Sequence, residues 1–191
     1  MIDAADAIIA SDGLSALTIP ELAMRAHVPV GSVYQYFVDK SVVVDAVAAR
    51  YNRLSLELLH EAADRIVDLP WNAAVNVVFA HMAGMYREHP TFCELWLNGH
   101  LSPGARERDR QNNDALAELL VETLAQRPEF QHARRLRLAC RMAVEAADAL
   151  LRYAFTLNLD GDRATLTEAK RMLSTYLLLY ASPATQSSQP T

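Results

Sequence analysis

Glycine and cysteine are both scarce in this sequence of 191 residues, which contains 6 glycines and 2 cysteines. A β-rich fold needs many tight turns, and glycine is one of the residues that build them, so the low glycine content argues against such a fold. The two cysteines, Cys93 and Cys140, are too few for a disulfide framework, and neither belongs to a CxxC pair. We therefore expect both thiols to be reduced and buried.

Long apolar runs and a basic leader are also missing. No apolar run reaches the roughly 18 residues that a membrane span needs. The first six residues include Asp3 and Asp6, where a secretory signal would need basic residues. We therefore expect a cytoplasmic protein that does not enter the membrane. The formal net charge of −5 also argues against a protein that coats nucleic acid nonspecifically.

Motifs of catalysis and metal binding are absent as well. The six histidines are dispersed, and none of them forms an HExxH motif or another ligand pair at helical spacing. The sequence has no glycine-rich phosphate loop and no nucleophile elbow. We therefore expect no enzyme activity, no metal and no cofactor.

What the sequence does contain is a high share of apolar residues, 51%, arranged largely with the period of a helix. Glycine and proline interrupt this pattern at several points, which predicts an all-α fold of about nine helices. The helices are expected near residues 2–11, 18–27, 30–37, 39–64, 71–89, 91–100, 105–126, 129–157 and 163–181. Residues 182–191 are rich in Ser, Pro and Gln, and we expect a disordered tail there.

The second and third predicted helices are short and close together. The segment Thr18-Ile19-Pro20-Glu21 has the pattern of a capping box, with Thr18 as the N-cap and Glu21 three residues later. A tight turn near His27 separates this helix from the next, and a helix on either side braces the pair. This arrangement predicts a helix-turn-helix in a three-helix N-terminal domain.

The third helix has two unlike sides. On a helical wheel, Val30, Val33 and Phe37 fall together and are expected to pack on the preceding helices. The opposite side carries Gly31, Ser32, Gln35 and Tyr36, with Tyr34 at its margin. We therefore expect one side of the helix to pack on the protein and the other to read a DNA groove. Hydroxyl groups can bond phosphates, and glutamine can pair with an adenine edge. Lys40 stands in the first turn of the next helix, where the helix dipole disfavours a positive charge, so we expect it to contact a phosphate. The two tyrosines could instead be packing residues.

The spacing of these residues resembles the DNA-binding domain of the tetracycline-repressor (TetR) family. The similarity covers Ile2 to Lys40, and its most specific part is the ending Tyr34-Gln35-Tyr36-Phe37 followed by Lys40. The resemblance implies that residues 31–37 are a recognition helix. It further implies that the DNA backbone is held by Thr18, Tyr34, Tyr36 and Lys40, and that bases are faced by Val30, Ser32 and Gln35.

Two features depart from the family pattern. His27 stands where the family usually has a glycine in a left-handed conformation, so His27 is expected to bear that strain or the turn to differ. Family members also carry basic residues ahead of the first helix, whereas this sequence starts at Met1 inside the helix pattern. Residues 1–60 hold seven acidic and four basic side chains. For the chain as written, we expect weak DNA binding.

The rest of the chain is expected to dimerise. The resemblance divides it into a DNA-binding domain, 1–45, and a ligand-binding and dimerisation domain, 46–181. The last helix has an apolar stripe wider than its own core needs, which predicts a partner chain. In the family the last two helices pair with their twofold mates, although a purely intramolecular bundle would also fit the pattern. The stripe consists of Leu166, Ala169, Leu173, Tyr176, Leu177 and Tyr180, widened by Leu178 and Leu179.

The resemblance also implies a cavity for an unknown small-molecule effector. Asp148 is the sharpest candidate, because an acid on an apolar stretch needs a cationic ligand, a neighbouring Arg141 or Arg152, or solvent. Methionine and aromatic walls with a few polar groups suit such a pocket. The expected lining residues are Phe79, Met82, Met85, Tyr86, Phe92, Trp96, His100, Asn113, Leu116, Leu120, Arg141, Glu145, Asp148 and Arg152.

The function implied is that of a ligand-responsive transcriptional regulator, most commonly a repressor. It would bind a palindromic double-stranded operator as a homodimer and leave it when an effector shifts the heads through the long fourth helix. The alternative is a helical small-molecule-binding or adaptor protein of the same fold with weak or lost DNA binding. Steep weakening of DNA binding with rising salt would favour the regulator.

Overall fold

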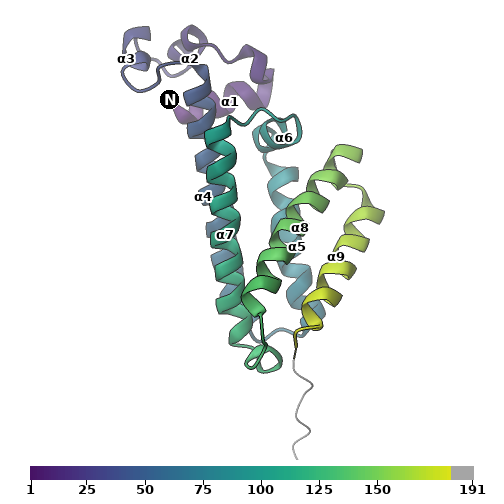
Figure 1. The fold of residues 1–191 in the computed structure, drawn as a ribbon. Coiled ribbons are helices and arrows are strands. Elements are labelled where there is room, and N and C mark those ends of the chain that lie inside the picture. The colour runs from purple at the N-terminus through teal and green to yellow at the C-terminus, as the bar shows by residue number, and fades with distance from the viewer. Residues whose placement is uncertain (182–191) are drawn as a thin grey trace, which may run out of the picture.

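The computed structural model describes residues 1–181, and within that range the chain forms nine α-helices and no strand (Figure 1). The predicted all-α fold is therefore confirmed, while the predicted tail, 182–191, lies outside the described residues. No helix in residues 1–181 combines the length and the apolar character needed to cross a membrane. The helices are α1 (Ile2–Asp12), α2 (Ile19–Arg25), α3 (Val30–Tyr34), α4 (Lys40–Ile66), α5 (Trp71–Glu88), α6 (Pro90–Leu97), α7 (Pro103–Ala125), α8 (Leu136–Leu157) and α9 (Arg163–Leu178).

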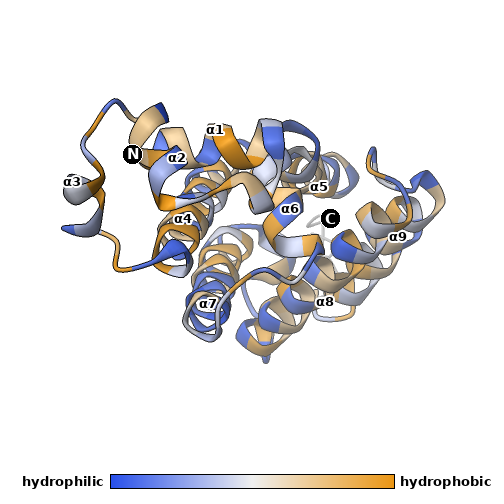
Figure 2. Ribbon diagram, turned by 90° about the horizontal axis from the view of Figure 1, so that it is seen from above, coloured by the Kyte–Doolittle hydropathy of each residue, from blue (hydrophilic) through white to orange (hydrophobic). Residues whose placement is uncertain are grey.

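Helices α1, α2 and α3 form a small head at one end of the molecule, and α3 projects to its side (Figures 1 and 2). A short 3-10 turn, η1 (Leu14–Ala16), follows α1. Thr18 caps α2 as predicted, since its hydroxyl accepts from the Glu21 amide at 3.3 Å. The Glu21 side chain does not complete the capping box; it pairs with Arg25 at 2.8 Å.

Helix α4 joins the head to the body. It has 27 residues and is therefore about 40 Å long. Asp39 begins it, because its carboxylate accepts from the amides of Ser41 and Val42 at 2.8 and 3.2 Å. Along its length α4 packs mainly on α7 and also on α5, and α8 packs between α7 and α9. The body is therefore a bundle whose longest member carries the head.

The hydrophobic core continues from the head into the body. One cluster of buried residues includes Ile8 and Val47 from the head side and also Phe92, Trp96 and Phe155 from the body. A second cluster fills the far end of the bundle around Phe79, Phe130 and Leu173. Because α4 and its core pass residue 45 without a break, the division of the chain at that point stays a prediction.

Two further expectations about the helices are wrong. The helix expected over 129–157 begins only at Leu136. Before it come a buried Arg127, a 3-10 turn, η2 (Pro128–Phe130), and Arg135, whose left-handed backbone has φ 65°. Val30, expected to pack beside Val33, is 42% exposed. Helix α3 has only 5 residues, so the wheel drawn over eight residues does not apply at its ends.

Gly161 holds the turn between α8 and α9. Its φ is +84°, a conformation that residues with a side chain rarely adopt. A Cβ atom at this position would lie 2.8 Å from Leu166 Cδ1 and 2.9 Å from Phe155 Cζ. Phe155 is fully buried and stacks on Tyr86 with ring centroids 4.6 Å apart, so this turn supports the core from the side of α8.

Gly161→Ala is expected to lower the free energy of unfolding by about 2–4 kcal/mol, since backbone strain and a steric clash add together. Gly99→Ala is the matched control, because Gly99 also has a positive φ of 71° but nothing lies within 4 Å of its missing Cβ. That variant is expected to lose only about 1 kcal/mol. Equal losses in chemical denaturation would contradict the packing role of Gly161.

Candidate DNA-reading face and effector cavity

The outer side of the head presents the residues expected to read DNA. Val33 is fully buried against α2, which fixes the rotation of α3, and Phe37 is 8% exposed. Gly31, Tyr34, Gln35 and Tyr36 are exposed, and Ser32 is half-buried. Tyr34 and Tyr36 are 54% and 68% exposed, so in the isolated chain they are not packing aromatics. The structure thus brings these residues to one exposed region, and their contacts with DNA stay a prediction.

His27 adopts the left-handed conformation that its position requires. Its φ is 55°, and the following Val28 amide donates to the Ala23 carbonyl at 3.0 Å, which ends α2. Backbone strain of this kind amounts to about 1 kcal/mol for a residue with a side chain. The turn between α2 and α3 is therefore kept despite the missing glycine.

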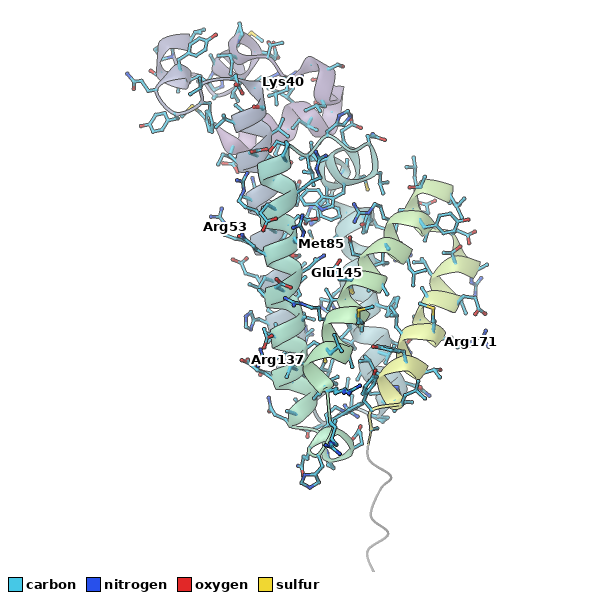
Figure 3. The ribbon with its side chains drawn as sticks, viewed as in Figure 1. Lys40, Arg53, Met85, Arg137, Glu145 and Arg171 are labelled. Carbon is cyan, nitrogen blue, oxygen red and sulfur yellow. The ribbon has the colours of Figure 1, made fainter. Side chains whose placement is uncertain are left out.

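The basic side chains of the head are largely engaged within the protein. Arg25 pairs with Asp12 and Glu21, both at 2.8 Å, and Arg50 pairs with Asp3 at 2.6 Å. Lys40, labelled in Figure 3, donates to the Leu14 carbonyl at 2.5 Å and so ties α4 to η1. An ammonium group has further donors, so this bond leaves Lys40 able to meet a phosphate.

A cavity of about 150 Å³ lies in the body and is lined by residues of α4 through α9. Its walls are mainly apolar and aromatic, and Figure 3 shows Met85 inside the bundle. Ten of the expected residues line it: Phe79, Met82, Met85, Tyr86, Phe92, Trp96, Asn113, Leu116, Leu120 and Asp148. Their contact with a ligand stays a prediction.

Four expected residues do not line the cavity. His100 is exposed and lies 3.7 Å from Glu94. Arg141 is exposed and pairs with Asp114 on α7, and Glu145 is also exposed. Arg152 pairs with Asp148, one turn earlier on α8, so a neighbouring arginine supplies the partner that the sequence required of Asp148.

Asp109, a second acid in the cavity wall, was not among the residues expected from the sequence. It lies on α7 in a run of charged residues, a pattern that is typical of a solvent-exposed helix face. Its helical position could have identified it, because Asp109 precedes Asn113, Leu116 and Leu120 by four, seven and eleven residues and therefore shares their face. Trp96 Nε1 donates to its carboxylate at 3.1 Å.

Burial raises the pKa of Asp109 to about 6, and the neighbouring Asp148 adds to the shift. The Trp96 hydrogen bond and Arg152 act in the opposite direction, and Glu145 is a smaller raising influence. The pKa of Asp148 is also raised by burial, against the lowering effect of Arg152. The cavity therefore disfavours negative charge on both of the acids in its wall.

An aromatic cluster separates the cavity from the head. Phe92 and Trp96 of α6 stack with centroids 4.2 Å apart, and Tyr86 meets Phe92 edge-on at 4.9 Å. Tyr51 of α4 lies edge-on to both α6 rings, at 5.8 and 6.4 Å. Its hydroxyl donates to the Asp6 carboxylate of α1 at 2.7 Å. Residues that line the cavity thus contact residues that hold the head.

Neither cysteine is in a disulfide: Cys140 is buried, and Cys93 is half-buried with its thiol donating to the Tyr86 carbonyl at 2.8 Å. In residues 1–181, no three His, Cys, Asp or Glu side chains are grouped so as to hold a metal ion. The apolar walls of the cavity suit an apolar molecule, and two acids stand among them.

Asp109→Asn is expected to stabilise the protein at pH 7 by about 1–2 kcal/mol, after allowance for water reaching the cavity. The folded state raises this pKa from 3.8 to about 6, so the folded state binds the extra proton between those values and stability falls as pH rises through them. The gain should therefore shrink towards pH 4. Thermal unfolding of the variant at both pH values measures it.

Asp114→Asn is the matched control, because Asp114 lies on the same helix but pairs with Arg141 outside the cavity. This variant is expected to show no gain at pH 7. Loss of stability in Asp109→Asn at pH 7 would contradict the unfavourable burial of the Asp109 charge.

Comparisons with known proteins agree with the geometry at both ends of the chain. The family model for bacterial regulatory proteins of the tetR family matches residues 1–47, and the model for the tetracyclin repressor-like C-terminal domain matches residues 69–181. No curated protein sequence matches.

Two solved structures illustrate the likeness. A TetR-family transcriptional regulator from Streptomyces coelicolor is 30% identical, with 94% of this chain and 96% of that one covered and a TM-score of 0.68. FadR from Bacillus subtilis, a transcriptional regulator in complex with stearoyl-CoA, is 16% identical, with 93% and 95% covered and a TM-score of 0.64, which shows a shared fold. With both family models matched and this level of identity, the chain belongs to the TetR family of transcriptional regulators.

Proposed function

We propose that this regulator is a homodimeric repressor that leaves a palindromic operator when a small molecule occupies the cavity. The observation that carries the proposal is the position of the cavity: its aromatic roof, Phe92 and Trp96, contacts Tyr51, which in turn holds α1 of the head. A molecule that rearranges the roof would therefore act on the head directly. In this proposal the head, residues 1–45, binds DNA, and the body, residues 46–181, binds the effector.

The DNA contact would be made by the exposed side of α3, by Gln35 and Tyr36 directly after it, and by the N-terminus of α2. Gln35 is exposed and can pair with an adenine edge, while Val30, Gly31 and Ser32 allow close approach to the groove. The backbone would be held by the hydroxyls of Thr18, Tyr34 and Tyr36 and by Lys40. Few cations face this region, so affinity would depend on shape and hydrogen bonds as well as on charge.

The coupling would use two sets of contacts between body and head. The fully buried Thr91 of α6 donates to the Asp6 carbonyl of α1 at 3.1 Å. At the start of α7, the hydroxyl of Ser102 and the guanidinium of Arg108 both donate to one carboxylate oxygen of Asp45, each at 2.8 Å. Effector binding between α6 and α7 would thus move α1 and α4 together, and with them the spacing of two heads in a dimer.

The dimer would form through α8 and α9. Ala169, Leu173 and Leu177, which belong to the stripe expected on α9, are buried within the chain. The large apolar side chains that remain exposed form a second stripe, which consists of Leu138, Met142, Tyr153 and Leu157 on α8 and Met172 and Leu178 on α9, each 42–57% exposed. A single chain leaves this stripe in water, which supports a partner over a purely intramolecular bundle. A twofold axis here would place two heads on one side of the dimer.

An enzyme is disfavoured because the cavity wall holds no nucleophile paired with a base and no metal-binding group is formed by residues 1–181. A repressor of this kind would act in the cytoplasm, where its operator lies. The second candidate, an adaptor that kept the fold but lost DNA affinity, draws support from the acidic head, whose bases are engaged by Asp3, Asp12 and Glu21. DNA selection separates the two.

Selection from a random DNA pool at low salt is expected to enrich a palindromic site for the unaltered protein. Gln35→Ala should weaken that site about tenfold and relax base preference at one position in each half, because the adenine pair is lost. Gln111→Ala is the control, since Gln111 is an exposed glutamine on α7. Absence of any enriched site, or equal affinity of Gln35→Ala, would contradict the DNA-binding role.

Met142→Glu is expected to convert a dimer into a monomer, because Met142 is 52% exposed within the apolar stripe and a charge there would be buried without a partner. Gln111→Glu adds the same charge on the exposed side of α7 and should remain dimeric. Sedimentation velocity distinguishes these states. A monomeric unaltered protein, or a dimeric Met142→Glu, would contradict the assignment of the interface to α8 and α9.

A further inference from the structure

Two acids line the cavity, and only one of them has an ion-pair partner. Asp148 pairs with Arg152 on its own helix, whereas among residues 1–181 Asp109 is in no ion pair and accepts only the Trp96 indole bond. The arginines beside Asp109 in the sequence do not neutralise it, because Arg108 pairs with Asp45 and Arg110 with Glu107. The cavity therefore contains a carboxylate whose negative charge is not balanced directly.

Most of the groups around Asp109 are those that stabilise a cation; the exception is Arg152, whose guanidinium is paired with Asp148. Trp96 and Phe92 stack against each other and Tyr86 lies edge-on to Phe92, so aromatic rings gather at the same end of the cavity. Ring faces attract a positive charge, and the attraction grows when water is excluded. Burial raises the pKa of Asp109 to about 6, a penalty that a bound cation would relieve.

The cavity offers no comparable partner for an anion. Arg127 lines the far end, but its guanidinium donates to the carbonyls of Ile66 and Val67 at 2.6 and 3.2 Å and pairs with Glu129 at 2.8 Å. His81 also lines the wall, with its Nδ1 2.8 Å from the Val77 carbonyl. A carboxylate or phosphate that entered the cavity would find two acids and donor groups that are already bonded to the protein.

We infer that the effector is a hydrophobic organic cation, with an ammonium group held by Asp109 and the rings of Trp96 and Tyr86 and an apolar body in the space between α5, α7 and α8. This inference rests on the proposed function, since it gives the ligand class for the same cavity. A cavity of about 150 Å³ accepts an apolar body on the scale of one aromatic ring. Small aromatic amines are therefore suitable probes.

The test uses three probes of matched shape and different charge: 3-phenylpropylamine, 3-phenylpropan-1-ol and 3-phenylpropanoate. Binding to the full-length protein is followed by isothermal titration calorimetry and by the fluorescence of Trp96, with Trp71 at the far end of the cavity as the second emitter. The amine is expected to bind about tenfold more tightly than the alcohol, because a charged hydrogen bond is formed away from water, and the carboxylate more weakly than both.

Asp109→Asn keeps the shape of the side chain and an acceptor for Trp96 but removes the charge. It should weaken the amine about tenfold and leave the alcohol within about twofold. Asp114→Asn, an acid of the same helix outside the cavity, should change neither affinity. Because Asp109→Asn is expected to stabilise the fold, a loss of amine binding would not reflect unfolding.

Equal binding of the amine and the alcohol, tighter binding of the carboxylate, no binding of the amine, or an unchanged amine affinity in Asp109→Asn would each overturn the inference. The proposed function is tested separately, because selection of an operator by the ligand-free protein does not involve the cavity. An enriched operator without preference for the amine would leave a repressor with a different effector. Preference for the amine without any operator would leave a cation-binding protein that has lost DNA binding.

Discussion

Tyr51 lies where the head, the long helix and the body meet. Its ring contacts Phe92 and Trp96 of α6, and its hydroxyl donates to Asp6 of α1. With 4% of its surface exposed, it has no room to move without displacing one of these partners. Since the same α6 rings line the cavity, the roof of the effector site is also the support of the DNA-binding head. Other links between the two parts, at Thr91 and Asp45, reinforce this arrangement.

Most of the fold was predictable from the sequence, because helix signals act locally. Thr18 and Asp39 begin α2 and α4 as their capping residues require, and His27 takes the left-handed conformation that its place in the turn demands. The start of α8 was not predictable in this way. Tertiary contacts hold the segment before α8 in another conformation: Phe130 is buried, and Arg127, which pairs with Glu129, bonds to the end of α4. Local patterns carry no information about such a partner.

The candidate site was predictable where it depends on residue type and helical phase. Eight apolar or aromatic wall residues on α5, α6 and α7 follow from the helical pattern, whereas the apolar residues that α4, α8 and α9 contribute to the wall were not expected from it. The positions of charged side chains were harder to predict, because their partners come from other helices. Arg141 pairs with Asp114 outside the cavity, whereas Asp109 lies on the side of α7 that lines the cavity. The acid with the stronger functional interest thus stands in the most polar stretch of the sequence. The unbalanced charge of Asp109 lowers the stability of the folded state, and groups that are positioned for binding often have this effect.

The most direct measurement of coupling between cavity and head is the reciprocal linkage of the two ligands. The affinity of the dimer for its selected operator would be measured with and without saturating 3-phenylpropylamine, and the affinity for the amine with and without the operator. Coupling through the Tyr51 cluster predicts that each ligand weakens the other by the same factor, about tenfold or more. Tyr51→Phe, which removes the bond to Asp6, should reduce that factor. An operator affinity that is unchanged when the cavity is filled would contradict the connection between effector site and DNA-binding head.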